Sequence, residues 1–267
     1  MLGFEFIVLF LLLGLLVGLM AGLLGIGGGA LMVPILTSIF LLQGVPTEKV
    51  MHLALGTSMA SIIATSFASL RAHHKVDGVI WDIVKRMAVG VVLGTFCSTF
   101  FASYISSLYL AVFFVVFMVL VAVQMFFNQK PQLSRELPST AKLLMAGSGI
   151  GAVSALVSIG GGSLMVPYLT WQNVEIKKAI GTSAAIGLPI SIAGTLGYLV
   201  NGWGMTSTEN YTFGFIYLPA VLLISTASFF TAPIGAKLAH NLPVAVLKKC
   251  FALLLILLAL KMLWSLI

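Results

Sequence analysis

The sequence predicts an all-α, polytopic membrane protein, and three observations support this fold class. Hydrophobic residues make up 60% of the 267 residues, charged residues only 8%, and the mean hydropathy is +1.14. Soluble domains carry about 25% charged residues, so the composition excludes a soluble enzyme with an ordinary core. Apolar runs of about 20 residues, each long enough to cross a ~30 Å hydrocarbon layer, recur along the chain. Finally, two blocks of sequence occur twice, which indicates a duplicated unit.

The clearer repeat is rich in glycine: GIGGGALMVPIL at Gly25–Leu36 returns as SIGGGSLMVPYL at Ser158–Leu169. A second pair follows in the same order, with LALGTSMA at Leu53–Ala60 and KAIGTSAA at Lys178–Ala185. Two blocks shared in the same order indicate a gene duplication. We refer to them as the glycine block and the GTS block.

Each repeat contains about five apolar segments, of which the second is unusually short. We expect membrane segments at 6–25, 28–42, 51–70, 86–104, 108–127, 142–158, 162–172, 179–200, 213–236 and 246–266. At 1.5 Å per residue, the segment 162–172 is too short to span a bilayer, so the second segments are predicted to be broken or re-entrant helices. The polar stretch Asn128–Lys142 connects two transmembrane repeats, 1–130 and 131–267, with about 8–10 membrane segments in all.

Loop charges predict that the two repeats are inverted relative to each other. Arg71–Arg86 is rich in bases, whereas its counterpart Asn201–Thr212 has none. Ser103–Leu108 is uncharged, whereas its counterpart Lys237–Lys249 carries three lysines. Cytoplasmic loops hold the excess of Lys and Arg, so both termini are expected outside a cytoplasmic (inner) membrane. The same bias accounts for the net charge of +7, since no basic tract suited to nucleic acid is present.

Glycines spaced by four residues predict close helix packing rather than a binding site. Gly14, Gly18 and Gly22 show this spacing, as do Gly90 and Gly94. Small residues at this spacing let neighbouring membrane helices approach closely, and the pattern carries little specificity.

Three consecutive glycines, Gly27–Gly29 and Gly160–Gly162, are different because they have no packing period. They allow the backbone to leave the helix, and Pro34 and Pro167 each remove one hydrogen bond from the short segment that follows. Irregular backbone at membrane depth survives where it is buried in protein or lines a wet cavity. Paired interruptions at corresponding positions of two halves therefore predict a transporter's binding site.

The GTS blocks are a second candidate for that site, near the start of the next predicted helix. They comprise Gly56, Thr57 and Ser58 in the first repeat and Gly181, Thr182 and Ser183 in the second. One interpretation is helix capping; the other is that free amides and hydroxyls at the helix start bind an anion. One turn earlier, His52 and Lys177 would draw anions toward the site, or would simply be solvated interfacial bases.

The residue types that are missing exclude several other functions. No Asp or Glu lies in the middle of a predicted segment, so neither an acidic proton relay nor a carboxylate-lined cation path is visible. No P-loop, HExxH or other catalytic constellation is present. The sequence therefore predicts no enzyme activity, no cofactor and no metal site.

The doubled blocks GIGGG-x-LMVP and SIGGG-x-LMVP, with ALGTS and AIGTS, resemble the sulfite exporter TauE/SafE family, also called the 4-toluene sulfonate uptake permeases. The resemblance covers essentially the whole chain. It implies transport of a small sulfur-containing anion such as sulfite, a sulfonate or sulfoacetate. It also implies that both glycine blocks, their prolines and the threonines and serines of the GTS blocks surround the substrate.

These observations favour a secondary transporter that binds such an anion between two inverted halves and works by alternating access. The alternatives are an anion channel, a transporter of a non-sulfur organic anion, and a non-transporting membrane enzyme or assembly factor. Coupling to protons or sodium, the direction of transport and the exact substrate stay open. A homodimer in the lipid bilayer is compatible with the sequence, which identifies no interface.

Overall fold

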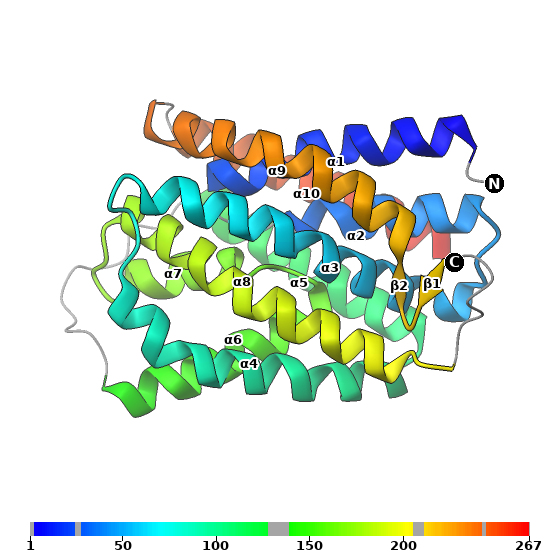
Figure 1. The fold of residues 1–267 in the computed structure, drawn as a ribbon, viewed down its shortest axis with the longest axis horizontal. Helices are drawn as coiled ribbons and strands as arrows, with labels where there is room; N and C mark the ends of the chain where they lie inside the picture. Colours follow the sequence, from blue (N-terminus) through cyan, green and yellow to red (C-terminus); the bar gives the residue numbers. More distant parts are fainter. Residues whose placement is uncertain (1–2, 25–27, 128–138, 205–210, 242–243, 267) are drawn as a thin grey trace.

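The computed structural model describes residues 3–24, 28–127, 139–204, 211–241 and 244–266 (Figure 1). The first half of the chain forms α1 (Phe4–Leu24), α2 (Gly29–Leu42), α3 (Thr47–His74), α4 (Trp81–Tyr104) and α5 (Ser107–Phe127). The second half forms α6 (Thr140–Val157), α7 (Gly162–Trp171), α8 (Ile176–Asn201), β1 (Thr212–Phe213), β2 (Ile216–Tyr217), α9 (Leu218–Asn241) and α10 (Val244–Leu266).

The helices confirm an all-α polytopic membrane fold. Seven helices in the described ranges are long and apolar enough to cross a membrane. The second helix of each half is short, as predicted: α2 has 14 residues and α7 has 10. The antiparallel hairpin of β1 and β2 was not predicted, because its two-residue strands are too short to show an alternating pattern.

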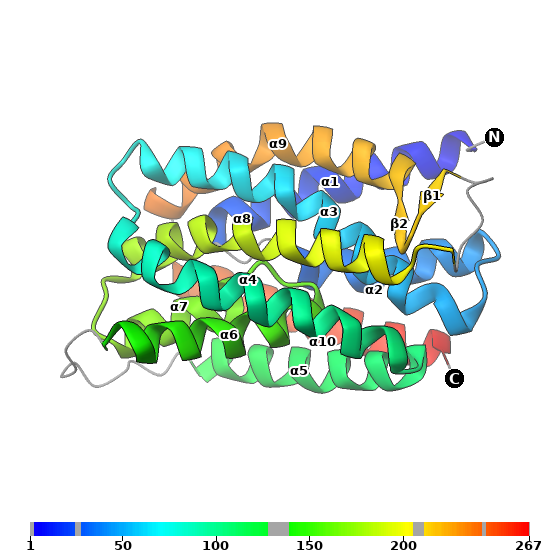
Figure 2. The ribbon, with the colours of Figure 1, turned by 60° about the horizontal axis from the view of Figure 1, so that its bottom comes forward.

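The helices lie side by side in one elongated bundle with α3 and α8 near its middle (Figures 1 and 2). These two helices run antiparallel. Gly56, early in α3, packs on Tyr198, late in α8, while Gly181, early in α8, packs on His73, late in α3. A β-carbon at either glycine would lie 3.1 Å from the β-carbon of its aromatic or imidazole neighbour.

Closely packed glycines join α1 to α9 and α4 to α6. Gly14, Gly18 and Gly22 face the backbone of α9, and Gly90 and Gly94 face the backbone of α6, so that an added β-carbon would overlap it. The predicted packing role of these glycines is confirmed. The two contacts are counterparts, because each joins the first helix of one half of the chain to the fourth helix of the other half. The first helices are α1 and α6, and the fourth helices are α4 and α9. The α3–α9 and α8–α4 contacts correspond in the same way.

The described chain begins and ends at one end of the bundle, here called the terminal end (Figures 1 and 2). Most bases with described side chains lie toward the other end, here called the basic end: Arg71, Lys75, Lys85, Arg86, Lys142, Lys177, Lys178 and Lys237. Lys49 and Lys261 lie toward the terminal end. The bundle is therefore strongly asymmetric in charge along its long axis.

Candidate functional site

The glycine blocks interrupt the helices at Gly28 and Gly161, as the sequence predicts. Each residue precedes a short helix in the left-handed conformation, with φ of 82° and 80° respectively. A residue with a β-carbon adopts this conformation only with strain, so glycine is required there. Gly27, predicted to belong to the same break, lies outside the described residues.

The two interruptions meet in the interior of the bundle. A β-carbon at Gly29 would overlap the carbonyl group of Ser158, which precedes the second interruption. The same β-carbon would lie 3.1 Å from Cδ1 of Ile62, near the middle of α3. On α8, a β-carbon at Gly187 would lie 2.7 Å from the carbonyl oxygen of Gly160. The short helices α2 and α7 therefore both begin beside the middle of the α3–α8 pair.

Each short helix begins with backbone amides that are not used in the helix. Met32 donates to the Gly28 carbonyl, and Met165 donates to the Gly161 carbonyl. Leu31 and Leu164 donate to the same two carbonyls. The remaining amides of each first turn, those of Gly29 and Ala30 in α2 and of Gly162 and Ser163 in α7, have no hydrogen bond to another described residue. The N-terminus of a helix carries a partial positive charge, so two such ends in a buried region form a favourable environment for an anion.

Two serine hydroxyls near these helix starts are buried without a partner. The Oγ atoms of Ser58 and Ser163 make no hydrogen bond within the described part of the chain, and the two residues are 0% and 6% exposed. Ser58 lies on the face of α3 that also carries Leu55 and Ile62. The carbonyl of Leu55 accepts a hydrogen bond from the Ser158 hydroxyl at 3.1 Å. Leaving a buried hydroxyl unpaired costs about 1–3 kcal/mol, so both groups are free donors for a ligand.

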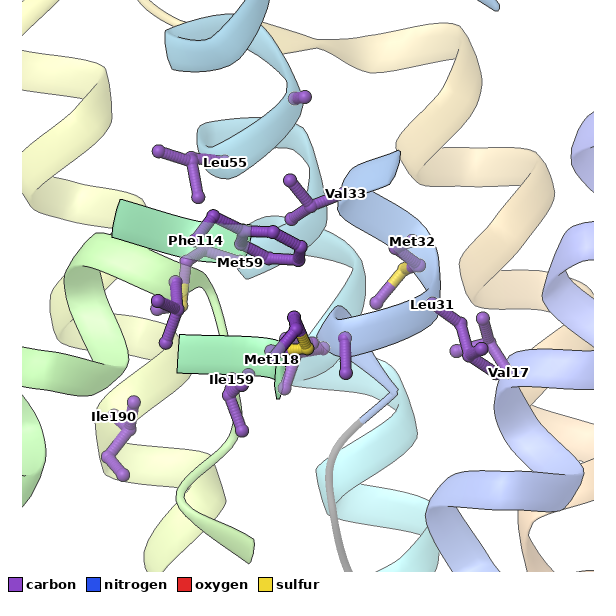
Figure 3. Packing of buried hydrophobic residues seen from close by; sticks show 14 of the residues in the cluster. Val17, Leu31, Met32, Val33, Leu55, Met59, Phe114, Met118, Ile159 and Ile190 are labelled. Atoms are coloured by element: carbon purple, nitrogen blue, oxygen red, sulfur yellow. The ribbon is translucent and has the colours of Figure 1, made fainter. Parts of the chain in front are cut away.

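The surroundings of these donors are apolar. Figure 3 shows Ile159, Phe114 and Met118 lying near Met59 of α3, with Ile190 of α8 in the same cluster. Such side chains exclude water and lower the local dielectric constant. Amide and hydroxyl dipoles directed at an anion are worth more in these surroundings than in water.

Pro34 and Pro167 lie inside α2 and α7, as expected from their places in the glycine blocks. The carbonyl of Pro34 accepts a hydrogen bond from the Ser38 hydroxyl at 3.0 Å, and that of Pro167 accepts one from the Thr170 hydroxyl at 2.9 Å. Because proline has no amide hydrogen, each of them also removes one hydrogen bond from a helix that is already short.

The GTS blocks do not lie at helix starts, and this expectation was wrong. Helix α3 begins at Thr47 after Pro46, and α8 begins at Ile176 after Glu175. The blocks therefore lie more than one turn inside their helices, where backbone amides are used in the helical hydrogen bonds. The expected free amides of the GTS blocks do not exist, because each helix extends further toward its N-terminus than the apolar pattern indicates.

In the first repeat, the GTS block holds the hairpin before α9. Gly56 allows the carbonyl of Phe215 to approach the helix so closely that a β-carbon would overlap it. The Thr57 hydroxyl oxygen accepts a hydrogen bond from the Tyr217 amide at 3.0 Å. Burial raises the pKa of the Tyr217 phenol, whose side chain is also hydrogen-bonded to Gln43, so the phenol stays neutral.

In the second repeat, the GTS block holds the connection before α4 in the same way. Gly181 faces the carbonyl of Gly78, and the Thr182 hydroxyl oxygen accepts a hydrogen bond from the Ile80 amide at 3.0 Å. Ser183 is buried and donates to the Ile180 carbonyl at 3.1 Å. Each GTS block thus fastens a connection that belongs to the other half of the chain.

The structure does not bring the two GTS blocks together. Gly56 contacts one end of α8 and Gly181 contacts His73, so the blocks are separated by about 17 residues along α3, or about 25 Å. The two glycine interruptions do come together, beside the face of α3 that carries Leu55, Ser58 and Ile62. Substrate binding by Thr57 and Thr182 stays a prediction, but these residues do not share one site.

His52 and Lys177 also lie at opposite ends. His52 is only 5% exposed; its Nε2 lies 3.0 Å from the Ala102 carbonyl and its ring centroid 5.0 Å from that of Phe215. The expectation of a solvated base is therefore wrong for His52, because α4 and the hairpin cover it. Lys177 is exposed in the first turn of α8, at the basic end. The two residues cannot form a shared surface that attracts anions.

The bundle is that of a polytopic membrane protein, and the two short helices follow interruptions that contact each other inside it, an arrangement typical of membrane transporters. The family model of the sulfite exporter TauE/SafE matches residues 10–262. The chain belongs to the sulfite exporter TauE/SafE family and is a transporter rather than an enzyme.

Curated relatives agree with this assignment. A probable membrane transporter protein of Haemophilus influenzae is 40% identical over 260 residues, covering 97% of this chain and 98% of the relative. Relatives of the same description are 28% identical in Methanocaldococcus jannaschii, covering 80% and 79%, and 23% identical in Bacillus subtilis, covering 86% and 89%. No solved structure matches the chain.

Proposed function

We propose that the protein is a secondary transporter that moves a small sulfur-containing oxyanion, such as sulfite or a sulfonate, across the cytoplasmic membrane by alternating access. The observation that carries the proposal is the contact of the two glycine interruptions in the apolar interior, with an unpaired hydroxyl from Ser163 in the first turn of α7 and another from Ser58 on the adjoining face of α3. Membership of the TauE/SafE family supports a sulfur-containing substrate.

An oxyanion suits these donors better than a cation would. A charged substrate loses its hydration in such a site, and several convergent donors are needed to offset that cost. The described carboxylates, Glu5, Glu48, Asp77, Asp82 and Glu175, are all exposed, so none of them repels an anion in the interior. A sulfite or sulfonate group presents three oxygen atoms, enough to accept from amides of both short helices and from a hydroxyl.

Alternating access is supported by the paired contacts between the two halves. The α1–α9 and α4–α6 contacts correspond, and so do the two connections held by Thr57 and Thr182. An inverted repeat of this kind works by rocking of one half against the other around a fixed site. We place the basic end in the cytoplasm, following the positive-inside bias, and both termini outside.

The test is transport by purified protein in proteoliposomes. Uptake of labelled sulfite, a sulfonate, sulfate and chloride would be compared with and without imposed proton and sodium gradients. A carrier shows saturable uptake of a sulfur oxyanion and accumulation driven by one gradient. Non-saturating flux of chloride and sulfite alike would indicate the channel alternative, and flux of none of these anions would refute the substrate class.

Variants locate the site in the same assay. Ser163→Ala and Ser58→Ala each remove one free donor, and each should raise the half-saturating sulfite concentration by about tenfold or more. The matched control is Thr226→Val, because its hydroxyl is on the exposed face of α9 and donates to the Leu222 carbonyl. Unchanged sulfite transport in both serine variants would remove these hydroxyls from the site.

A further inference from the structure

Counterpart residues of α3 and α8 can be recognised by their contacts. His73 Nε2 is hydrogen-bonded to the Gly22 carbonyl at 3.2 Å, and the Tyr198 hydroxyl donates to the Ala155 carbonyl at 2.8 Å. His73 and Tyr198 are 125 positions apart, the spacing of the GTS blocks, and Gly22 and Ala155 are 133 apart, the spacing of the glycine blocks. Residues 125 positions apart therefore occupy equivalent places on α3 and α8.

One face of α3 carries a line of buried hydroxyls that runs from the central site toward the basic end. Ser58, Thr65 and Ser69, here called the hydroxyl track, lie within about 40° of one another around the helix. They are 0%, 0% and 2% exposed. Thr65 donates to the Ser228 hydroxyl of α9 at 2.9 Å, whereas the Oγ atoms of Ser58 and Ser69 have no partner among the described residues.

The equivalent face of α8 keeps one buried hydroxyl, that of Ser183, the counterpart of Ser58, which donates to the Ile180 carbonyl at 3.1 Å. The face is apolar where α3 carries Thr65 and Ser69. The counterparts of Thr65 and Ser69 are Ile190 and Gly194. Ser228 of α9 corresponds to Val91 of α4, because Tyr217 and Ile80, which are held by Thr57 and Thr182, are the same 137 positions apart. The hydrogen-bonded pair of Thr65 and Ser228 is thus replaced by two fully buried aliphatic side chains.

Side-chain volume follows the same asymmetry. The thioether of Met59 on α3 covers Gly194 of α8, where a β-carbon would lie 2.9 Å from the sulfur. The counterpart of Met59 is Ala184 of α8, and the counterpart of Gly194 is Ser69. The Met59 side chain therefore closes the α8 face at Gly194. At the equivalent place beside Ser69 of the hydroxyl track, the corresponding side chain is only the methyl group of Ala184.

We propose that the hydroxyl track is the path along which the transported anion passes between the central site and the basic end, and that the α8 face forms the closed side. This inference rests on the proposed anion transport. The buried hydroxyls of Ser58 and Ser69 have no protein partner among the described residues, so a transient ligand would supply the acceptor they lack. A partly dehydrated oxyanion accepts hydrogen bonds from hydroxyl donors of this kind. The bases at the basic end would concentrate anions at the mouth of this path.

Cysteine accessibility tests the path without using transport as the readout. In a background of Cys97→Ala and Cys250→Ala, single variants Ser69→Cys and Thr65→Cys would be compared with Ile190→Cys, the counterpart of Thr65. Lys75→Cys, which replaces an exposed lysine, marks the basic end. Membrane vesicles of both orientations would be treated with two impermeant methanethiosulfonate reagents, one bearing a sulfonate and one bearing a quaternary ammonium group.

We expect Ser69→Cys and Thr65→Cys to react from the side on which Lys75→Cys reacts. The sulfonate reagent should react with them faster than the ammonium reagent by about tenfold, corresponding to about 1.4 kcal/mol. Ile190→Cys should be unreactive from either side. The proposal is overturned if Ser69→Cys and Thr65→Cys stay unmodified while Lys75→Cys reacts, or if Ile190→Cys reacts as fast as they do.

A second measurement separates a path from a binding site. Ser69→Ala should lower the maximal rate of sulfite transport by about tenfold while leaving the equilibrium affinity for sulfite unchanged. Ser191→Ala is the control, because Ser191 is buried on α8 and donates to the Leu188 carbonyl at 2.9 Å. An unchanged rate in Ser69→Ala refutes the path. If no sulfur anion is transported although the cysteines react as expected, the substrate assignment fails and the path remains.

Discussion

Two adjacent residues of the first GTS block should respond in opposite ways to loss of their hydroxyls. The Thr57 oxygen accepts the hydrogen bond of the Tyr217 amide at 3.0 Å, whereas the buried Ser58 oxygen has no partner in the described ranges. Thr57→Val leaves the amide of Tyr217 without an acceptor, which should destabilise the fold by about 1–3 kcal/mol. Ser58→Ala removes an unpaired buried hydroxyl, so stability should be unchanged or higher.

The effect on substrate binding should be the reverse. A hydrogen bond from a hydroxyl to a charged oxygen is worth about 1.5–3 kcal/mol, so Ser58→Ala should weaken sulfite binding by about 10- to 150-fold. Thr57→Val should weaken sulfite binding much less, because the Thr57 hydroxyl is hydrogen-bonded to the Tyr217 amide of the hairpin before α9. The measurements are thermal unfolding of the purified protein in detergent and equilibrium binding of labelled sulfite. The reasoning fails if Ser58→Ala binds sulfite normally, or if Thr57→Val unfolds at the wild-type temperature.

Three further predictions concern the close contacts of glycine and the ligand. Gly29→Ala should prevent stable folding, because a β-carbon there overlaps the Ser158 carbonyl. The control Gly149→Ala should be neutral, because a β-carbon at Gly149 meets nothing within 4 Å. The yield and monodispersity of the detergent-solubilised protein distinguish the two outcomes. Gly94→Ala should separate α4 from α6 at Ser148 and lower the unfolding temperature, and an unchanged temperature would show that this contact adjusts at little cost. Sulfite at 100 times its dissociation constant should stabilise the wild type by about 2.7 kcal/mol, while an equal concentration of chloride should give no such increase.

The sequence by itself determined the elements of this protein. Long apolar runs specify membrane-spanning helices because the hydrocarbon layer requires every backbone group to be paired within the segment. The predicted segments 28–42 and 162–172 correspond closely to α2 and α7, because consecutive glycines at Gly28 and Gly161 permit a backbone conformation closed to other residues. The packing of Gly14 and its neighbours was also predictable, since a spacing of four residues places them on one helix face.

Only the tertiary structure decided which of these elements meet. The antiparallel crossing of α3 and α8 separates Thr57 from Thr182 and gives each a connection of the opposite half to hold, a relation that no local pattern encodes. Burial of His52 depends on α4 and on a hairpin whose strands are too short to be recognised. The pairing of Gly29 with Ser158 and the contrast between the faces of α3 and α8 likewise arise from contacts between residues far apart in the chain. Such contacts depend on the shape and direction of whole helices, whereas a sequence pattern records only which side of one helix is apolar.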